Sequence, residues 1–192
     1  TGCGATSPHR CSRPEYCIKE QYSSVFNLVK SVDLYICQFF TLYMIGKWYL
    51  VGFASNADWF VSRKAKMTMG TTILTPQPSG DLQMDYSNLR SDGTCWKMSH
   101  LAQKSDIPGK FVYQNQRYGT DNDMRVVDVK YDEYCLMYSF KTKEGSSYIL
   151  NQMYSRTQKP SQEVLKKFTK FSLDQGILPE NIAILPKAEE CS

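Results

Sequence analysis

Residues 134–155 read YCLMYSFKTKEGSSYILNQMYS, and this stretch decides the fold. Two runs rich in aromatic and aliphatic residues flank the turn sequence Lys143-Glu144-Gly145-Ser146, a pattern typical of two antiparallel strands. The first run is apolar at every position from Tyr134 to Tyr138. Both faces of this strand are therefore expected to be covered, as in a barrel that has an interior on one side and a helix on the other.

The same rhythm continues upstream as far as Gly46. Short segments rich in Val, Ile, Tyr, Phe, Thr and Met alternate with turn signals such as Pro76-Gln77-Pro78-Ser79-Gly80. Short strands at regular spacing, with no helices between them, predict either a sandwich or an up-and-down barrel. Eight strands also suffice to close a barrel around one small ligand. The eight predicted strands are Trp48–Ser55, Ala65–Thr75, Asp81–Leu89, Thr94–Leu101, Lys110–Gln114, Asp123–Lys130, Tyr134–Lys141 and Ser147–Ser155.

The periodicity changes downstream of residue 155. In Pro160–Asp174 the apolar residues Val164, Leu165, Phe168 and Phe171 share one face at helical spacing. Pro160 suits the first turn of this helix, and Gly176 suits its C-terminal cap. A last short strand is expected at Asn181–Leu185. Because one amphipathic helix cannot bury its stripe alone, it is expected to pack on the outside of the barrel.

The N-terminal part differs in character. Residues 1–45 are predicted to form a poorly ordered or atypical tail, which leaves residues 46–192 as the folded domain. Within the tail, residues 34–45 are apolar on all sides but fall short of the roughly 20 residues that a membrane-spanning helix needs. The chain does not begin with Met, so the sequence leaves open whether a signal peptide has been removed. Four of the seven cysteines lie in this tail, and their pairing stays open: Cys3, Cys11, Cys17 and Cys37.

Composition excludes several functional classes. The formal net charge of +4 is small and dispersed, which argues against a nucleic-acid partner. The two histidines and the absence of a CxxC pair argue against a metal site. An odd count of seven cysteines favours at least one disulfide and an oxidising compartment.

Two motifs bring a specific resemblance. Gly46-Lys47-Trp48 opens the first predicted strand, and Tyr154-Ser155-Arg156-Thr157-Gln158 ends the eighth. Together with the strand rhythm, they resemble the lipocalin family. The resemblance implies an all-β fold: an eight-stranded up-and-down antiparallel β-barrel with one C-terminal α-helix packed outside. It also implies that Arg156 lies across the Trp48 ring at the closed end of the barrel, as a cation–π contact.

The chain is most similar to the lipocalin-type prostaglandin D synthases and their non-enzymatic relatives. The phrases GFASNADW at residues 52–59 and LPENIAILPKAEEC at residues 178–191 carry this similarity. It implies a disulfide between Cys95 and Cys191. One family signature departs from its usual form, because Val129-Lys130-Tyr131 stands where lipocalins usually have Thr-Asp-Tyr.

The enzymatic alternative is disfavoured by one substitution. The prostaglandin D synthases use a cysteine thiolate inside the barrel, and the corresponding residue here is Gly70, which has no side chain to attack a substrate. The matching supporting positions are Leu50, Thr72 and Tyr86, of which Thr72 alone keeps an aliphatic hydroxyl. We therefore assign no catalytic residue and no cofactor, and expect Gly70 to enlarge the space that the thiol would fill.

A siderophore-binding role is the other alternative. Siderocalins hold an anionic iron chelate with three inward cationic side chains, and the matching positions here are His100, Lys141 and Leu150. One permanent cation is a poor match for a triply charged ligand.

The favoured interpretation is a secreted, extracellular carrier of a small hydrophobic ligand such as a retinoid, a fatty acid or another lipid. The loop Asn56–Arg63, with Trp59 and Phe60, is expected to act as a lid. Cys135 is expected to be a buried thiol on a strand that lies beside the helix. A cell-surface receptor is a further candidate partner, and the oligomeric state stays open. The resemblance selects the inward residues of a ligand site: Leu50, Gly70, Thr72, Tyr86, Met98, Phe111, Tyr113, Met124, Met137, Ser139, Leu150, Gln152 and Tyr154.

Overall fold

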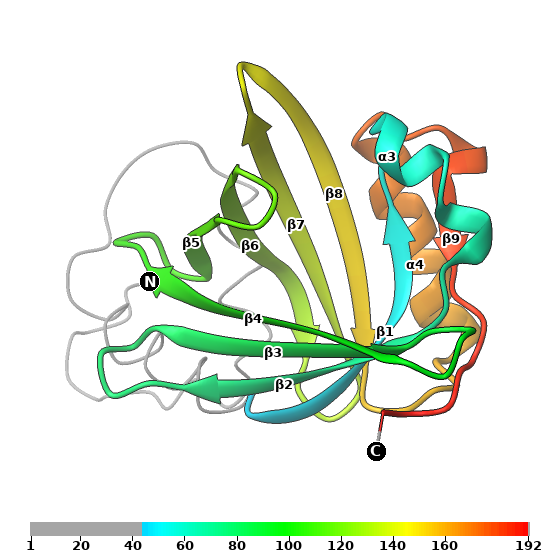
Figure 1. Cartoon of the computed structure of the whole chain (residues 1–192), viewed down its shortest axis with the longest axis horizontal. Helices are drawn as coiled ribbons and strands as arrows, with labels where there is room; N and C mark the ends of the chain where they lie inside the picture. Colours follow the sequence, from blue (N-terminus) through cyan, green and yellow to red (C-terminus); the bar gives the residue numbers. More distant parts are fainter. Residues whose placement is uncertain (1–43, 192) are drawn as a thin grey trace, which may run out of the picture.

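The computed structural model describes residues 44–191 of the chain (Figure 1). Eight antiparallel strands, β1 to β8, wind in sequence order into one sheet. The barrel closes because β1 pairs with β8 along one edge and with β2 along the other. The strands are β1 (Gly46–Ala54), β2 (Gly70–Pro76), β3 (Leu82–Leu89), β4 (Cys95–Lys104), β5 (Lys110–Asn115), β6 (Thr120–Lys130), β7 (Tyr134–Lys143) and β8 (Ser146–Ser155).

A ninth strand, two α-helices and two 3-10 helices complete the part of the chain that the structure describes. Strand β9 (Ile182–Ile184) pairs antiparallel with the C-terminal part of β1. The segments are α3 (Asp58–Val61), η2 (Lys64–Lys66), α4 (Gln162–Asp174) and η3 (Pro179–Asn181). The prediction of an eight-stranded up-and-down barrel with a C-terminal helix outside it is confirmed.

Helix α4 packs closely against the barrel because residue 52 of β1 is a glycine and leaves room for the helix. A Cβ atom at Gly52 would lie 2.8 Å from the Phe168 ring of α4 and 3.1 Å from Met153 of β8. Phe168 and Val164 are buried on this face, and the Asn151 side chain donates a hydrogen bond to the Ser172 hydroxyl of α4. The predicted apolar stripe therefore anchors the helix as expected.

Several element boundaries differ from the predicted ones, and two of them have a clear local cause. Strand β2 begins at Gly70 rather than at Ala65, because Lys64–Lys66 form a 3-10 turn. The helix begins at Gln162 rather than at Pro160: Ser161 is the N-cap, and its hydroxyl accepts a hydrogen bond from the Val164 amide. Serine satisfies an amide that would otherwise lack a partner in the first turn. Gly176 follows the helix with a φ of 77°, as its capping role requires.

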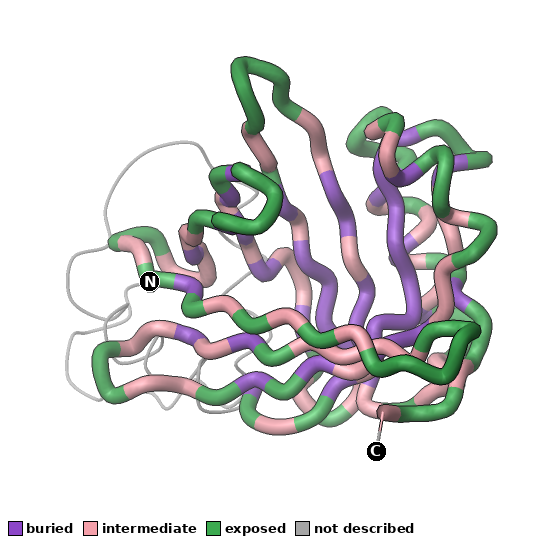
Figure 2. Tube along the Cα trace, viewed as in Figure 1, coloured by how far each residue is buried: buried purple, intermediate pink, exposed green. Residues whose placement is uncertain are grey.

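The extent of strand pairing varies around the barrel. Strands β6, β7 and β8 pair over most of their length, whereas β4 and β5 share only the pairs Gln103↔Val112 and Lys104↔Phe111. Burial follows the same division, since the inner sides of β1, β7 and β8 are largely buried and β4 alternates between half-buried and exposed residues (Figure 2).

Most of the predicted tail, residues 1–43, lies outside the described residues, together with the four cysteines placed there. Met44 and Ile45 are the exceptions. Met44 is buried, and its carbonyl accepts a hydrogen bond of 2.9 Å from the Trp48 indole nitrogen. The packed part of the chain therefore includes Met44.

Candidate ligand-binding site in the barrel

One end of the barrel, which we call the base, is closed by Trp48 and Arg156. Trp48 is completely buried, and the Arg156 guanidinium carbon lies 3.7 Å from the centre of its ring. The guanidinium also donates hydrogen bonds to the carbonyls of Tyr131 and Lys47, each at 2.9 Å. A planar cation that both stacks and donates at fixed angles suits arginine. The predicted contact between Trp48 and Arg156 is confirmed.

The turn that carries the altered family signature, Val129-Lys130-Tyr131, still contacts the base of the barrel. Although Val129-Lys130 replaces the usual residues before Tyr131, the Arg156 guanidinium still donates a hydrogen bond to the main-chain carbonyl of Tyr131. The Arg156 amide in turn donates to the Glu133 carbonyl at 2.9 Å. The turn between β6 and β7 therefore joins the end of β8 through backbone groups, which any sequence supplies.

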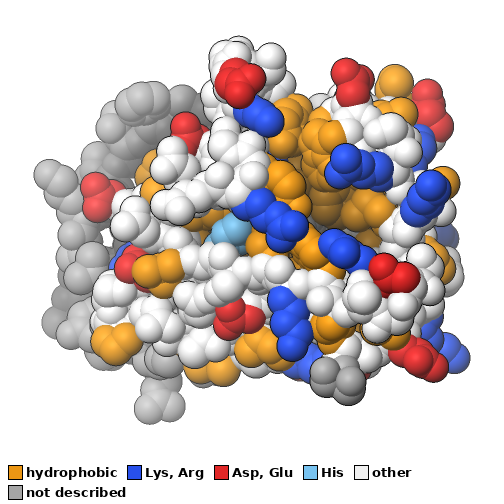
Figure 3. All heavy atoms as spheres, in the orientation of Figure 1, with side chains coloured by type: hydrophobic (Ala, Val, Ile, Leu, Met, Phe, Trp, Pro, Cys, Tyr) orange, Lys and Arg blue, Asp and Glu red, His pale blue; other side chains and the backbone are white. Residues whose placement is uncertain are grey.

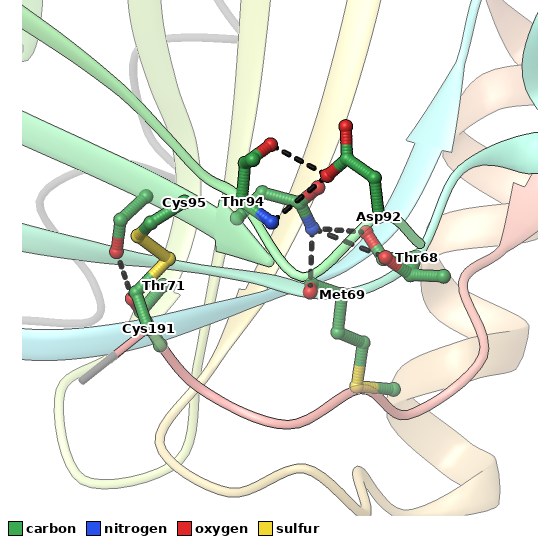
Figure 4. Close-up of a disulfide and its surroundings, with 9 residues drawn as sticks. Thr68, Met69, Thr71, Asp92, Thr94, Cys95 and Cys191 are labelled. Atoms are coloured by element: carbon green, nitrogen blue, oxygen red, sulfur yellow. Dashed lines mark hydrogen bonds between the residues drawn. A yellow bond between two sulfur atoms is a disulfide. The ribbon is translucent and has the colours of Figure 1, made fainter. Parts of the chain in front are cut away.

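A disulfide ties the C-terminal segment to β4. The Cys95–Cys191 bridge is formed, with its Cα atoms 5.7 Å apart, and it lies beside the turn where Asp92 accepts hydrogen bonds from Thr94 (Figure 4). Glu190 adds to the attachment, because its carboxylate accepts hydrogen bonds from Lys47 and Tyr49 of β1. The predicted pairing is confirmed.

The thirteen predicted site residues share the inner face. In an antiparallel pair, directly opposed residues project to the same side, so each cross-strand row can be followed around the wall. All thirteen fall in five rows, which run Trp48–Thr72–Tyr86–Met98, Cys135–Tyr154–Leu50–Gly70, Val126–Met137–Gln152–Phe53, Phe111–Met124–Ser139–Leu150 and Tyr113–Asn122–Lys141–Tyr148. Their side chains form one largely apolar wall with a few polar points.

The sequence missed several members of this wall. The rows include Phe53, Val126, Asn122 and Tyr148 beside the predicted set, and also Lys141, which the resemblance to siderocalins had already given as a match to an inward position. Phe53 faces inward because the register of β1 shifts between Leu50 and Gly52, which reverses the alternation that a regular strand would have. Strict period-two alternation therefore could not place it.

The expectation that Gly70 enlarges the interior was wrong. A Cβ atom at Gly70 would lie 2.3 Å from the Tyr86 hydroxyl, 2.5 Å from its ring carbon and 2.7 Å from the Ser87 carbonyl. The phenol of Tyr86 therefore occupies the space that a side chain at residue 70 would need. Burial raises the pKa of Tyr86 to about 12, so this phenol stays neutral at physiological pH.

Cys135 is buried and free, as expected, and its strand β7 lies beside the helix. Cys135 itself opposes Tyr154 in the inner row at the base, whereas the adjacent Tyr134 hydroxyl contacts Lys167 of α4. Complete burial raises the pKa of the Cys135 thiol. A neutral, enclosed thiol is a poor nucleophile, so Cys135 does not replace the thiol that residue 70 lacks.

The opposite end of the barrel, which we call the mouth, carries the short helix α3. Phe60 is buried and stacks on Phe53, with 4.9 Å between ring centres. Trp59 reaches across to Tyr148 of β8, with 6.2 Å between ring centres. The predicted lid segment therefore contributes aromatic contacts to two strands at the mouth; its opening stays a prediction.

Below α3 lies a group of polar residues that we call the lysine cluster, made of His100, Tyr113, Asn122, Lys141 and Tyr148. The His100 ring stacks on Tyr113 with 4.8 Å between centres, and the Lys141 ammonium lies 5.6 Å from the centre of Tyr113. Lys141 also donates a hydrogen bond to the Asn122 side-chain oxygen. Figure 3 shows a hollow on this side of the molecule, lined with hydrophobic side chains and bordered by histidine and by Lys or Arg side chains.

The electrostatics of the lysine cluster follow from burial. Removal from water lowers the pKa of Lys141 to about 8. Burial and the nearby charge of Lys141 lower the pKa of His100, and burial raises that of Tyr113 to about 12. At neutral pH the cluster therefore presents one cation, a mostly neutral imidazole and protonated phenols.

A separate hollow of about 320 Å³ lies against β5, β6 and β7. Its lining includes Tyr113 and Asn122 of the inner wall, but Val112, Asp123 and Phe140 belong to the outer face. We therefore do not count it as part of the barrel interior. Within residues 44–191, no group of His, Cys, Asp and Glu side chains is arranged to hold a metal ion, and no helix is long and apolar enough to cross a bilayer.

Comparisons with known proteins agree with this architecture. The model of the lipocalin / cytosolic fatty-acid binding protein family matches residues 45–189. A lipocalin from Rhinella marina is 39% identical over 148 residues, which is 77% of this chain and 80% of the relative. A prostaglandin-H2 D-isomerase from Mus musculus is 36% identical over 148 residues, or 77% and 78% of the two chains.

Solved structures give the same result. The siderocalin Ex-FABP, described as functioning through dual ligand specificities, superposes with a TM-score of 0.69 at 26% identity and covers 78% of this chain and 99% of its own. The siderocalin Q83, described as having a dual ligand binding mode, superposes with a TM-score of 0.67 at 28% identity, covering 78% of this chain and 92% of its own.

Proposed function

Because this chain belongs to the lipocalin / cytosolic fatty-acid binding protein family, whose members bind small hydrophobic ligands, we propose that it is a secreted carrier of a lipid held inside the barrel. The observation that carries the proposal is the inner wall. Met98, Met124, Met137, Phe111 and Leu150 form its apolar part, and flexible methionines adapt to ligands of different shapes.

The proposed path of the ligand runs through the mouth. Trp48 and Arg156 close the base, whereas the mouth is covered by the four-residue helix α3, whose Trp59 is half-buried. Release by displacement of a short aromatic segment requires no chemistry. The disulfide of Cys95 and Cys191 supports an oxidising, extracellular location.

A lipid-binding assay tests this function. The protein is titrated with retinoic acid and with a fluorescent fatty acid, and saturable changes are followed in tryptophan emission. Trp59 and Trp96 both contact inner-wall aromatic residues, Tyr148 and Tyr86. One-to-one saturation is expected, and the absence of saturable binding across a lipid panel would remove the carrier function.

A pair of matched variants locates the bound lipid. Ser139 is buried on the inner face between Met124 and Leu150, and its neighbour Phe140 is 41% exposed on the outer face. We expect Ser139→Trp to fill the interior and to abolish binding, and Phe140→Trp to bind as the wild type does. Equal binding by both variants would place the ligand elsewhere.

Isomerase activity is the second candidate, because several relatives are named prostaglandin-H2 D-isomerase. The geometry at Gly70 argues against it: residue 70 lacks a thiol and Tyr86 fills the corresponding space. We expect no conversion of prostaglandin H2 to prostaglandin D2 by the purified protein. Turnover that scales with protein concentration would reverse this view.

A further inference from the structure

The loop that joins β1 to β2, residues 56–69, is fastened to the C-terminal part of the chain. We call it the lid loop, and we call residues 176–191 the C-terminal segment. The Asn56 side chain donates a hydrogen bond of 2.9 Å to the Gly176 carbonyl, and its oxygen accepts one of 3.0 Å from the Leu178 amide. Both polar atoms of one side chain therefore tie the start of the lid loop to the C-terminal segment.

The rest of the lid loop has partners in the same segment. The Asn181 side chain donates a hydrogen bond of 3.2 Å to the Asn56 oxygen and accepts one of 2.7 Å from the Lys64 ammonium. Met69, the last residue before β2, donates from its amide to the Pro186 carbonyl at 2.9 Å. The lid loop therefore depends on the position of the C-terminal segment at its start, its middle and its end.

The C-terminal segment also completes the wall beside the lid loop. Its strand β9 pairs with Gly52–Ala54 of β1, beyond Leu50, where the pairing of β1 with β2 ends. Leu185 is buried, and its amide donates to the Val51 carbonyl at 2.9 Å. In Figure 1, β9 lies on the same side of the barrel as α3, and the segment continues from β9 to the end marked C.

The end of the C-terminal segment depends on the disulfide. It lies against the outer face of β1, β2 and β3, where it and the sheet enclose a gap of about 10 Å³. Glu190 bonds there to Lys47 and Tyr49, but the ion pair between Glu190 and Lys47 is exposed, and exposed ion pairs contribute little to stability. The covalent bond from Cys191 to Cys95 of β4 is therefore the strong attachment at this end.

The bridge is accessible to reductants, unlike the thiol in the barrel interior. Cys95 is exposed and Cys191 is half-buried, whereas Cys135 is completely buried. The thiolate of a dithiol can attack one bridge sulfur, which breaks the sulfur–sulfur bond and forms a mixed disulfide that the second thiol of the reductant then resolves. The dithiol supplies two electrons and two protons and becomes a disulfide, and Cys95 and Cys191 become free thiols.

We propose that the Cys95–Cys191 bridge is a redox latch on ligand exchange. Reduction by a dithiol frees the end of the C-terminal segment and loosens the hydrogen bond between Pro186 and Met69 first, because Pro186 lies five residues before Cys191. The lid loop then opens more often, while the pairing of β1 with β2 and β8, which does not involve the bridge, keeps the barrel closed. This inference rests on the carrier function proposed above.

Stopped-flow displacement tests the latch. The protein is loaded with cis-parinaric acid, a naturally fluorescent fatty acid, and mixed with excess oleic acid, so that the loss of fluorescence gives the release rate. The wild type is compared, with and without dithiothreitol, with Cys95→Ser/Cys191→Ser, Asn56→Ala and Met153→Ala. Asn56→Ala detaches the start of the lid loop while the bridge stays intact. Met153→Ala lowers stability by removing a buried side chain beneath α4, away from the lid loop. Circular dichroism first establishes which proteins are folded.

We expect reduction of the wild type to raise the release rate roughly two- to tenfold, the effect of losing one hydrogen bond. The equilibrium affinity should change little, because a lid that opens more often speeds both entry and release. Cys95→Ser/Cys191→Ser should release the probe at the higher rate with or without dithiothreitol. Asn56→Ala should release it faster than the wild type when both are oxidised, whereas Met153→Ala should match the oxidised wild type.

The results that would overturn the latch differ from the one that would remove the carrier function. Equal release rates for the oxidised and reduced wild type, or unfolding of the reduced protein, would overturn it. So would an unchanged rate in Asn56→Ala, a response to dithiothreitol that persists in the double cysteine variant, or equally fast release by Met153→Ala. If cis-parinaric acid shows no saturable binding to the oxidised wild type, the carrier function fails and the latch fails with it.

Discussion

The two ends of the barrel each contain a cationic side chain, but the surroundings of the two cations differ. At the base, the Arg156 cation stacks on Trp48 and donates to two backbone carbonyls. At the mouth, the Lys141 cation faces the interior, and within residues 44–191 its hydrogen bond goes to a neutral amide. The same kind of group is therefore satisfied at one end and left in need of a counter-charge at the other. The comparison shows that the two cations differ in the partners that surround them.

The largest loss of stability is expected from a substitution that disrupts the base. Trp48→Ala removes a completely buried indole, and with it the surface that Arg156 covers, so we expect a loss of roughly 3–5 kcal/mol of unfolding free energy. The control is Trp96→Ala, since Trp96 is half-buried and should cost clearly less. Urea denaturation followed by circular dichroism measures both, and equal losses would contradict the assigned importance of the base.

The disulfide should have the next largest effect. Cys95 and Cys191 enclose a separation of 96 residues, and replacing both by Ala should lower the unfolding free energy by about 2–4 kcal/mol. Lipid affinity should change little, since neither cysteine belongs to the inner wall. Reduction of the wild type should give the same loss. A double variant that is as stable as the oxidised protein would show that the C-terminal segment is held by Glu190 and its other contacts alone.

A smaller effect is expected where Tyr86 covers Gly70. Gly70→Cys places a side chain against the Tyr86 phenol and the Ser87 carbonyl, and such overpacking should cost roughly 1–3 kcal/mol. Tyr86→Ser in the same chain removes the phenol and should recover part of that loss. Unfolding curves of the single and double variants provide the measurement. If Gly70→Cys alone is as stable as the wild type, the phenol does not fill this space.

The smallest expected effect concerns the pH dependence of the mouth. Burial lowers the pKa of Lys141 from 10.5 to about 8, so between these values the unfolded chain binds more protons than the folded protein. Stability contributed by this group therefore rises with pH in that window and is lost as pH falls through 8. The lowered pKa corresponds to at most roughly 3 kcal/mol. Because Lys141 is half-buried, solvent screening should reduce the gain of the wild type over Lys141→Met between pH 8 and 10.5 to about 1 kcal/mol.

The difference between the two proteins isolates this lysine. His100, Tyr113 and Tyr148 face Lys141 and also titrate, but they are present in both chains, and His100 titrates below the window. A difference in unfolding free energy that is constant from pH 8 to 10.5 would show that Lys141 keeps an ordinary pKa.

The base was more predictable from sequence than the mouth, for a physical reason. Trp48 and Arg156 stand in two short motifs, and the family resemblance that these motifs bring implied both their contact and the pairing of Cys95 with Cys191. The lysine cluster instead depends on which face each strand turns inward. The inward position of Phe53 could not be predicted, because the register shift in β1 does not show in the sequence periodicity. The same holds for Gly70, where the phenol of Tyr86 from the neighbouring strand fills the space that a side chain would need.

Methyl NMR of ¹³C-labelled methionine tests the central claim most directly, because methionines lie on both faces of the barrel wall. Met98, Met124 and Met137 face the interior, whereas Met153 is packed beneath α4 beside Gly52. Titration with lauric acid is expected to shift the three inner methyl resonances saturably at one equivalent while Met153 stays nearly unchanged. Unchanged inner resonances at saturating lipid, or shifts confined to methionines outside the wall, would contradict a ligand-binding interior.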